Sequence, residues 1–166
     1  MSLEKARAWM RSEGRRDIAE GRSAREIEVL DRICRIALDL DGVVLHQGAK
    51  AGVAGEQPDL MFGRRKEGRK TPVLFAGVTL RPTGAEWFRR SPRPDPDVVR
   101  LHVRITEVGA NRSELAYLVQ NDDAPKPDPE WRWIDVPDTL DVSGDELLDL
   151  IEDSYLEAGG TSPVGI

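Results

Sequence analysis

The stretch VVRLHVRITEV, residues 98–108, alternates apolar and polar side chains over most of its length. A period of two is typical of a β-strand with one face on the core and the other open to solvent. The turn residues Gly109-Ala110-Asn111 come next, so we expect residues 115–120 to return antiparallel to this strand. The stretch therefore predicts an antiparallel sheet.

Four other segments have the composition of short strands: 43–46, 60–62, 72–80 and 131–136. The run RRKEGRK, residues 64–70, separates two of them and contains five bases and a glycine. Like charges spread into solvent and glycine favours a turn, so this run predicts the tip of a hairpin. The expected sheet has five to six strands.

Two helices have clear start and stop signals. Ser23 and Glu26 have the spacing of a capping box, and Ser143 and Glu146 repeat it before a last helix that Gly159-Gly160 ends. The first of these helices, 23–40, has an apolar face at steps of three and four residues. Its members are Ile27, Leu30, Ile33, Cys34, Ala37 and Leu38. Residues 2–20 also have helical composition, but their thin apolar stripe fits either a peripheral helix or an arm that orders against a partner.

Helices outside a run of antiparallel strands predict an α+β fold, a two-layer sandwich with N-terminal helices and a C-terminal helix. The 166 residues suffice for one domain, which we place at 23–158. An N-terminal helical arm, 1–22, precedes it and a disordered tail, 159–166, follows. The only cysteine, Cys34, excludes an internal disulfide. The chain has neither an apolar signal-peptide core nor a run of about 18 apolar residues, so we expect a cytoplasmic protein without a membrane span.

The formal charge of −6 hides a division along the chain. Residues 1–120 carry 22 Lys or Arg and 17 Asp or Glu, a balance of +5. Residues 121–157 carry two bases and thirteen acids, a balance of −11. Such asymmetry indicates either a basic surface for an anionic partner or two parts that neutralise each other in the fold.

The closing segment resembles the small MmcQ/YjbR-like domains, in which a strand with a similar tryptophan phrase leads into a final helix ending in Ser-Tyr. The matching residues are Trp133, Val136, Asp145, Glu146, Leu147, Leu150, Ile151, Ser154 and Tyr155. The resemblance implies a fold similar to that of CyaY/frataxin. It also implies the DNA-binding role often suggested for these domains, without an established reaction.

Motifs for catalysis, metals and cofactors are weakly represented. Cys34 lies on the apolar helix face, where a cysteine behaves as a small hydrophobic residue. His46 and His102 lack metal-ligand spacing and can meet only if their strands are neighbours. The acids of the last helix are typical of a solvated face, although frataxin-like folds bind metals weakly through similar acids: Asp145, Asp149, Glu152 and Asp153. We therefore expect no catalytic residue, no metal site and no cofactor.

A nucleic-acid-binding face is the strongest functional candidate. Cations and tryptophans project from the polar sides of two strands, and further bases lie in the hairpin tip and in the segment 81–97. The candidate residues are Arg64, Arg65, Lys66, Arg69, Lys70, Arg89, Arg90, Arg100, His102, Arg104 and Trp131. The same pattern also describes an ordinary solvated face, and tryptophans usually lie in the core.

The sequence thus favours a non-catalytic binding domain, with nucleic acid as the first partner to test. The alternative is a protein–protein interaction module that uses the acidic last helix or the basic hairpin tip. An enzyme acting on a small molecule is the third hypothesis, and a deep cleft with polar groups around His46 or His102 would favour it.

Overall fold

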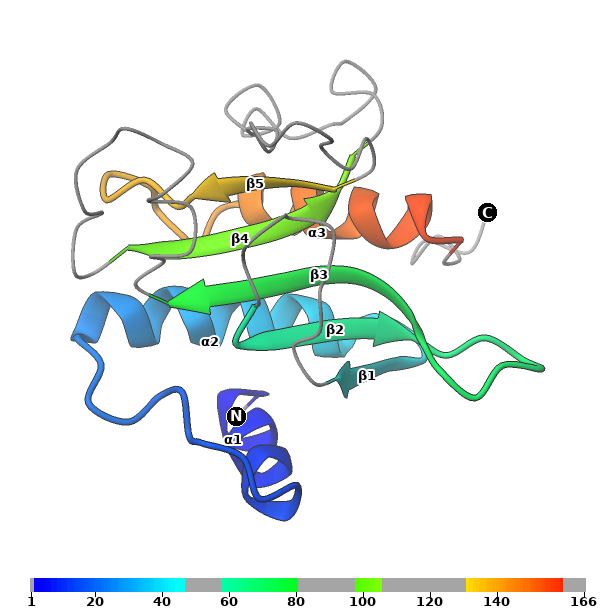
Figure 1. The fold of residues 1–166 in the computed structure, drawn as a ribbon. Helices are drawn as coiled ribbons and strands as arrows, with labels where there is room; N and C mark the ends of the chain where they lie inside the picture. The colour runs from blue at the N-terminus through cyan, green and yellow to red at the C-terminus, as the bar shows by residue number, and fades with distance from the viewer. Residues whose placement is uncertain (1, 47–57, 81–97, 106–130, 160–166) are drawn as a thin grey trace, which may run out of the picture.

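The computed structural model describes residues 2–46, 58–80, 98–105 and 131–159. Its elements are α1 (Ser2–Ser12), α2 (Ala24–Asp39), β1 (Val43–His46), β2 (Leu60–Arg64), β3 (Val73–Leu80), β4 (Val99–Arg104), β5 (Trp131–Asp135) and α3 (Asp145–Glu157). The five strands form one sheet in the order β1-β2-β3-β4-β5, and every neighbouring pair is antiparallel. Helices α2 and α3 lie against the same face of this sheet (Figure 1). The predicted α+β class is confirmed, while the strand expected at 115–120 lies outside the described residues.

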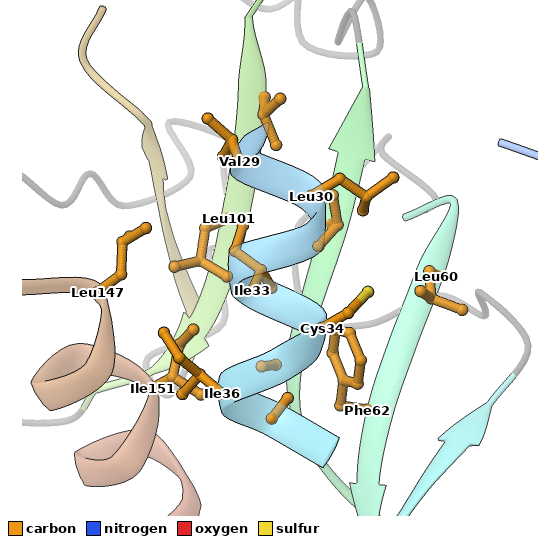
Figure 2. Packing of buried hydrophobic residues seen from close by; sticks show 14 of the residues in the cluster. Val29, Leu30, Ile33, Cys34, Ile36, Leu60, Phe62, Leu101, Leu147 and Ile151 are labelled. Atoms are coloured by element: carbon orange, nitrogen blue, oxygen red, sulfur yellow. The ribbon is translucent and has the colours of Figure 1, made fainter. Parts of the chain in front are cut away.

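Helix α2 forms the centre of the core. Its capping box is complete, because the Ser23 hydroxyl accepts from the Glu26 N–H at 3.1 Å and the Glu26 carboxylate accepts from the Ser23 N–H at 2.9 Å. Four residues of the predicted apolar face are buried: Leu30, Ile33, Cys34 and Ala37. The two residues at its ends, Ile27 and Leu38, are half-buried. The buried face is wider than predicted, since it also includes Val29 and Ile36. Figure 2 shows Ile36 beside Ile151 of α3, so α2 contacts both the sheet and a second helix.

Helix α1 packs against α2 and is part of the same core. Leu3, Ala6 and Met10 are at most 3% exposed, and they lie at three- and four-residue steps on one side of the helix. The guanidinium of Arg7 donates two hydrogen bonds to the Asp17 carboxylate, at 3.0 and 2.8 Å, and so holds the segment that leads from α1 to α2. The thin apolar stripe of residues 2–20 therefore belongs to a peripheral helix that is packed on the domain.

A β-bulge in β3 lies where α3 is fastened to the sheet. The pairing of β2 with β3 shifts between Phe62 and Gly63, which leaves Phe75 as the extra residue. The Ser154 hydroxyl of α3 donates to the Phe75 carbonyl at 2.5 Å and accepts from the Arg104 N–H at 2.6 Å. The next residue, Tyr155, donates to the Asp41 carbonyl at 2.7 Å and forms an edge-to-face ring contact with Phe75. The Ser-Tyr pair thus connects α3 to the sheet and to the α2–β1 turn.

The start of α3 differs from the prediction. The N-cap residue is Gly144 and no side chain caps the helix, so the expected capping box between Ser143 and Glu146 is wrong. The Ser143 hydroxyl and N–H instead donate to the Asp141 carboxylate, at 2.6 and 3.0 Å. An aspartate can accept from the N–H of the residue two positions later in a turn, and here Asp141 takes the Ser143 N–H that a capping box would direct to Glu146.

Candidate anion-binding groove

The basic run between β2 and β3 forms a hairpin tip, as the sequence predicts. All residues from Arg65 to Lys70 are exposed, and Gly68 takes a φ of 81°, which favours glycine. The backbone N–H of Arg65 donates to the Gly42 carbonyl at 2.9 Å, which ties the base of the tip to the α2–β1 turn. The tip therefore projects from a fixed position beside β1.

A groove of about 800 Å³ runs between this tip and helix α1. Three walls contribute to it: α1 and the end of α2, strand β1, and the hairpin tip with the two residues that follow it. The lining residues are Lys5, Trp9, Leu38, Val43, Val44, Leu45, Arg65, Lys66, Glu67, Gly68, Arg69, Lys70, Thr71 and Pro72. Residues that are about sixty positions apart in the sequence thus face one concave surface.

Strand β1, which lines the groove, is the outermost strand of the described sheet. Within the described residues, β1 pairs only with β2. Side chains of successive strand residues point to opposite faces, so a groove on one face would meet every second residue. The three consecutive residues Val43, Val44 and Leu45 all line this groove, which indicates that it follows the backbone edge of β1.

The groove is strongly basic. Of the lining residues that the structure describes, five are cationic and one, Glu67, is acidic. The cations are Lys5, Arg65, Lys66, Arg69 and Lys70, and all of them are exposed. None of the five makes a side-chain ion pair with another residue in the described part of the chain. Their charge is therefore not neutralised within that part of the fold, and it is concentrated around one concavity.

Arg64 was predicted to belong to this basic tip, but its side chain points elsewhere. It is the last residue of β2, and its guanidinium donates two hydrogen bonds to the Ala158 carbonyl at the end of α3, at 3.1 and 2.5 Å. Carbonyls at a helix C-terminus lack intrahelical donors, and a nearby cation stabilises them. Arg64 thus caps α3, whereas its neighbour Arg65 lines the groove.

The predicted sheet face does not present its cations to solvent. Arg100 is 2% exposed and forms a two-point ion pair with Asp135, its cross-strand neighbour, at 2.7 and 3.1 Å. Its guanidinium also lies 3.9 Å from the centre of the Trp133 ring. The expectation that Arg100 projects from an open face is therefore wrong. The ion pair also joins the basic part of the chain, residues 1–120, to the acidic part, residues 121–157, so the two parts neutralise each other at this point of the fold.

His102 is fully buried and is hydrogen-bonded to the Thr79 hydroxyl at 2.8 Å. Burial, reinforced by the charge on Arg100, lowers the pKa of His102 to about 3. The imidazole is neutral near pH 7 and offers no charge to a phosphate. Its expected place on an open face is wrong, because strand alternation predicts which side chains share a face and not whether that face is covered.

Four predicted site residues remain: Trp131 and Arg104 on the sheet, and Arg89 and Arg90 in the segment 81–97. Trp131 is 7% exposed and packs with Met61 and Leu74, so it is not an open stacking surface. Arg104 is half-buried, and its side chain donates to the Leu74 carbonyl at 3.4 Å. Arg89 and Arg90 lie outside the described residues.

The groups considered for metal or thiol chemistry are placed apart from the groove. His46 on β1 and His102 on β4 have two strands between them, about 14 Å at the usual strand spacing, so they do not meet. Cys34 is buried, as expected, and burial raises the pKa of its thiol to about 12. Across residues 2–46, 58–80, 98–105 and 131–159, no three His, Cys, Asp or Glu side chains gather as a set of metal ligands.

The sequence did not predict Lys5 and Trp9 as site residues. Both come from α1, whose thin apolar stripe left its position relative to the other elements open.

No helix in the described part of the chain combines the length and the apolar character needed to cross a bilayer. Comparison with known proteins finds no matching family model, no matching curated protein and no matching solved structure, so the similarity to MmcQ/YjbR-like domains stays a prediction.

Proposed function

We propose that this domain is a non-catalytic binding domain and that the basic groove binds the phosphate backbone of a nucleic acid. The observation that carries the proposal is the set of five exposed cations around one concave surface. Lys and Arg side chains neutralise phosphates and release condensed counterions, which supplies most of the affinity for nucleic acids that is independent of sequence.

The composition of the groove supports binding rather than catalysis. The described residues of its lining include no histidine, cysteine or aspartate, and their single carboxylate belongs to Glu67, in the exposed tip. A general acid or base usually needs a partner that orients it and shifts its pKa. An array of cations without such a partner fits electrostatic attraction and positioning of an anionic chain.

The test is fluorescence anisotropy with labelled DNA and RNA oligonucleotides at several salt concentrations. The double variant Lys66→Glu/Arg69→Glu reverses two groove charges, and we expect it to weaken binding at least about tenfold at low salt. Its matched control is Arg11→Glu/Arg16→Glu, which changes the net charge equally at two exposed residues that do not line the groove. Flat titrations of the native protein at low salt would exclude the proposal.

One observation favours a second candidate, an acidic protein segment. Strand β1 lines the groove and is the outermost strand of the described sheet, and an extended peptide can add to such an edge as a further strand. Acidic side chains of the peptide would then face the same five cations. A labelled acidic peptide that binds while oligonucleotides do not would favour this candidate.

A further inference from the structure

We infer that the groove selects single-stranded nucleic acid, with one unpaired base stacked on Trp9; this inference rests on the proposed function. Among the described residues that line the groove, Trp9 is the only aromatic one. It is half-buried, it packs against the core and it also lines the groove.

The position of Trp9 is fixed by its helix. Leu3, Ala6 and Met10 anchor α1 in the core, and the two hydrogen bonds from Arg7 to Asp17 hold the segment after it. An aromatic ring on an anchored helix loses little conformational entropy when a ligand stacks on it. Trp9 therefore has the properties of a preformed stacking surface.

The combination of Trp9 with cations should distinguish single-stranded from double-stranded nucleic acid. The bases of a duplex are stacked inside it, so a side chain in the wall of a groove would meet only its sugars and phosphates. An unpaired base exposes a flat apolar face that stacks on tryptophan, and its backbone carries phosphates on either side. Lys5 lies one helical turn from Trp9 on α1, and the other four groove cations belong to the hairpin tip, so two separate elements supply cations to the groove that holds this base.

The test compares a single-stranded oligonucleotide with the duplex of the same length, using the native protein and variants at Trp9. We expect the single strand to bind at least about tenfold more tightly than the duplex. Trp9→Leu keeps an apolar side chain for the core but removes the ring, and it should lower single-strand affinity about tenfold with little effect on the duplex. Trp9→Phe keeps a ring and should stay within about threefold of the native protein. Thermal unfolding of each variant shows whether it is folded.

The outcomes separate this inference from the proposed function. Equal binding of both forms, or unchanged single-strand affinity in folded Trp9→Leu, overturns the inference; the proposed function survives if Lys66→Glu/Arg69→Glu still weakens binding. Failure of both forms to bind overturns the proposed function as well. Binding of an acidic peptide alone overturns both and favours the second candidate.

Discussion

At the scale of single residues, Ser154 is a polar side chain that joins α3 to two strands of the sheet. It is fully buried and satisfies one acceptor, the Phe75 carbonyl, and one donor, the Arg104 N–H. Removing the hydroxyl leaves both backbone groups unsatisfied away from water. We expect Ser154→Ala to lower the free energy of unfolding by about 1–3 kcal/mol, measured by urea denaturation.

The matched control is Ser12→Ala. The Ser12 hydroxyl also donates to a backbone carbonyl, that of Trp9 at 2.8 Å, but on an exposed part of the helix where water can replace it. We expect this substitution to change the free energy of unfolding by no more than about 0.5 kcal/mol. Equal losses in the two variants would contradict the bridging role of Ser154.

A second residue, His102, couples the stability of the fold to pH. Its pKa is about 3 in the folded protein and close to 6.5 when exposed, so between these values the unfolded chain binds a proton that the native protein does not. Stability is therefore complete above pH 6.5 and falls below it by about 1.4 kcal/mol per pH unit. Urea denaturation between pH 7 and pH 4 measures this slope.

His102→Gln is the informative variant, because glutamine does not titrate and can still hydrogen-bond to Thr79. The free energy of unfolding should change less with pH in the variant than in the native protein. If both curves have the same slope between pH 6.5 and pH 4, other groups cause the acid sensitivity and the assignment to His102 is wrong.

At the scale of elements, Arg64 and Arg65 separate a structural role from a binding role. Arg64 caps α3 through the Ala158 carbonyl, whereas the Arg65 side chain is exposed and lines the groove. We expect Arg64→Ala to lower the free energy of unfolding by about 1 kcal/mol and Arg65→Ala to leave it nearly unchanged. Oligonucleotide affinity should show the opposite order. A larger loss of affinity in folded Arg64→Ala than in Arg65→Ala would place Arg64 in the binding surface instead.

The elements themselves could largely be predicted from sequence, because they depend on local signals. The Ser23–Glu26 box starts α2, β1 has the expected bounds, and the bases at 65–70 form a hairpin tip. The same signal failed at Ser143, since Asp141 takes its donors before the helix begins. Spacing alone does not tell which of two nearby acceptors a serine will meet.

The candidate site was less predictable, because its parts are distant in the sequence. The hairpin tip was expected, but Lys5 and Trp9 join it only through the packing of α1. Conversely, the alternation of β4 correctly groups Arg100, His102 and Arg104, yet burial removes the first two from solvent. Exposure depends on which elements pack together, and residue periodicity within one strand does not contain that information.

At the scale of the whole molecule, the division of charge is partly neutralised and partly retained. The Arg100–Asp135 pair joins the basic and acidic parts of the chain across β4 and β5. The groove contains no residue of α3, which holds most of the described acids of the closing segment. A protein with a net charge of −6 therefore has a locally basic concavity, and the local field should determine how binding responds to salt.

The salt dependence of binding tests this local field. If each of the five groove cations neutralises one phosphate of a single strand, the slope of log K against log salt concentration is about −3.5, since each contact contributes about −0.7. Lys66→Glu/Arg69→Glu removes two contacts and should reduce the slope to about −2. Arg11→Glu/Arg16→Glu makes the same change in net charge and should leave the slope near −3.5. Anisotropy titrations between 50 and 300 mM salt, about a sixfold range, resolve this difference. Equal slopes in the two variants would mean that net charge, rather than the groove, governs binding.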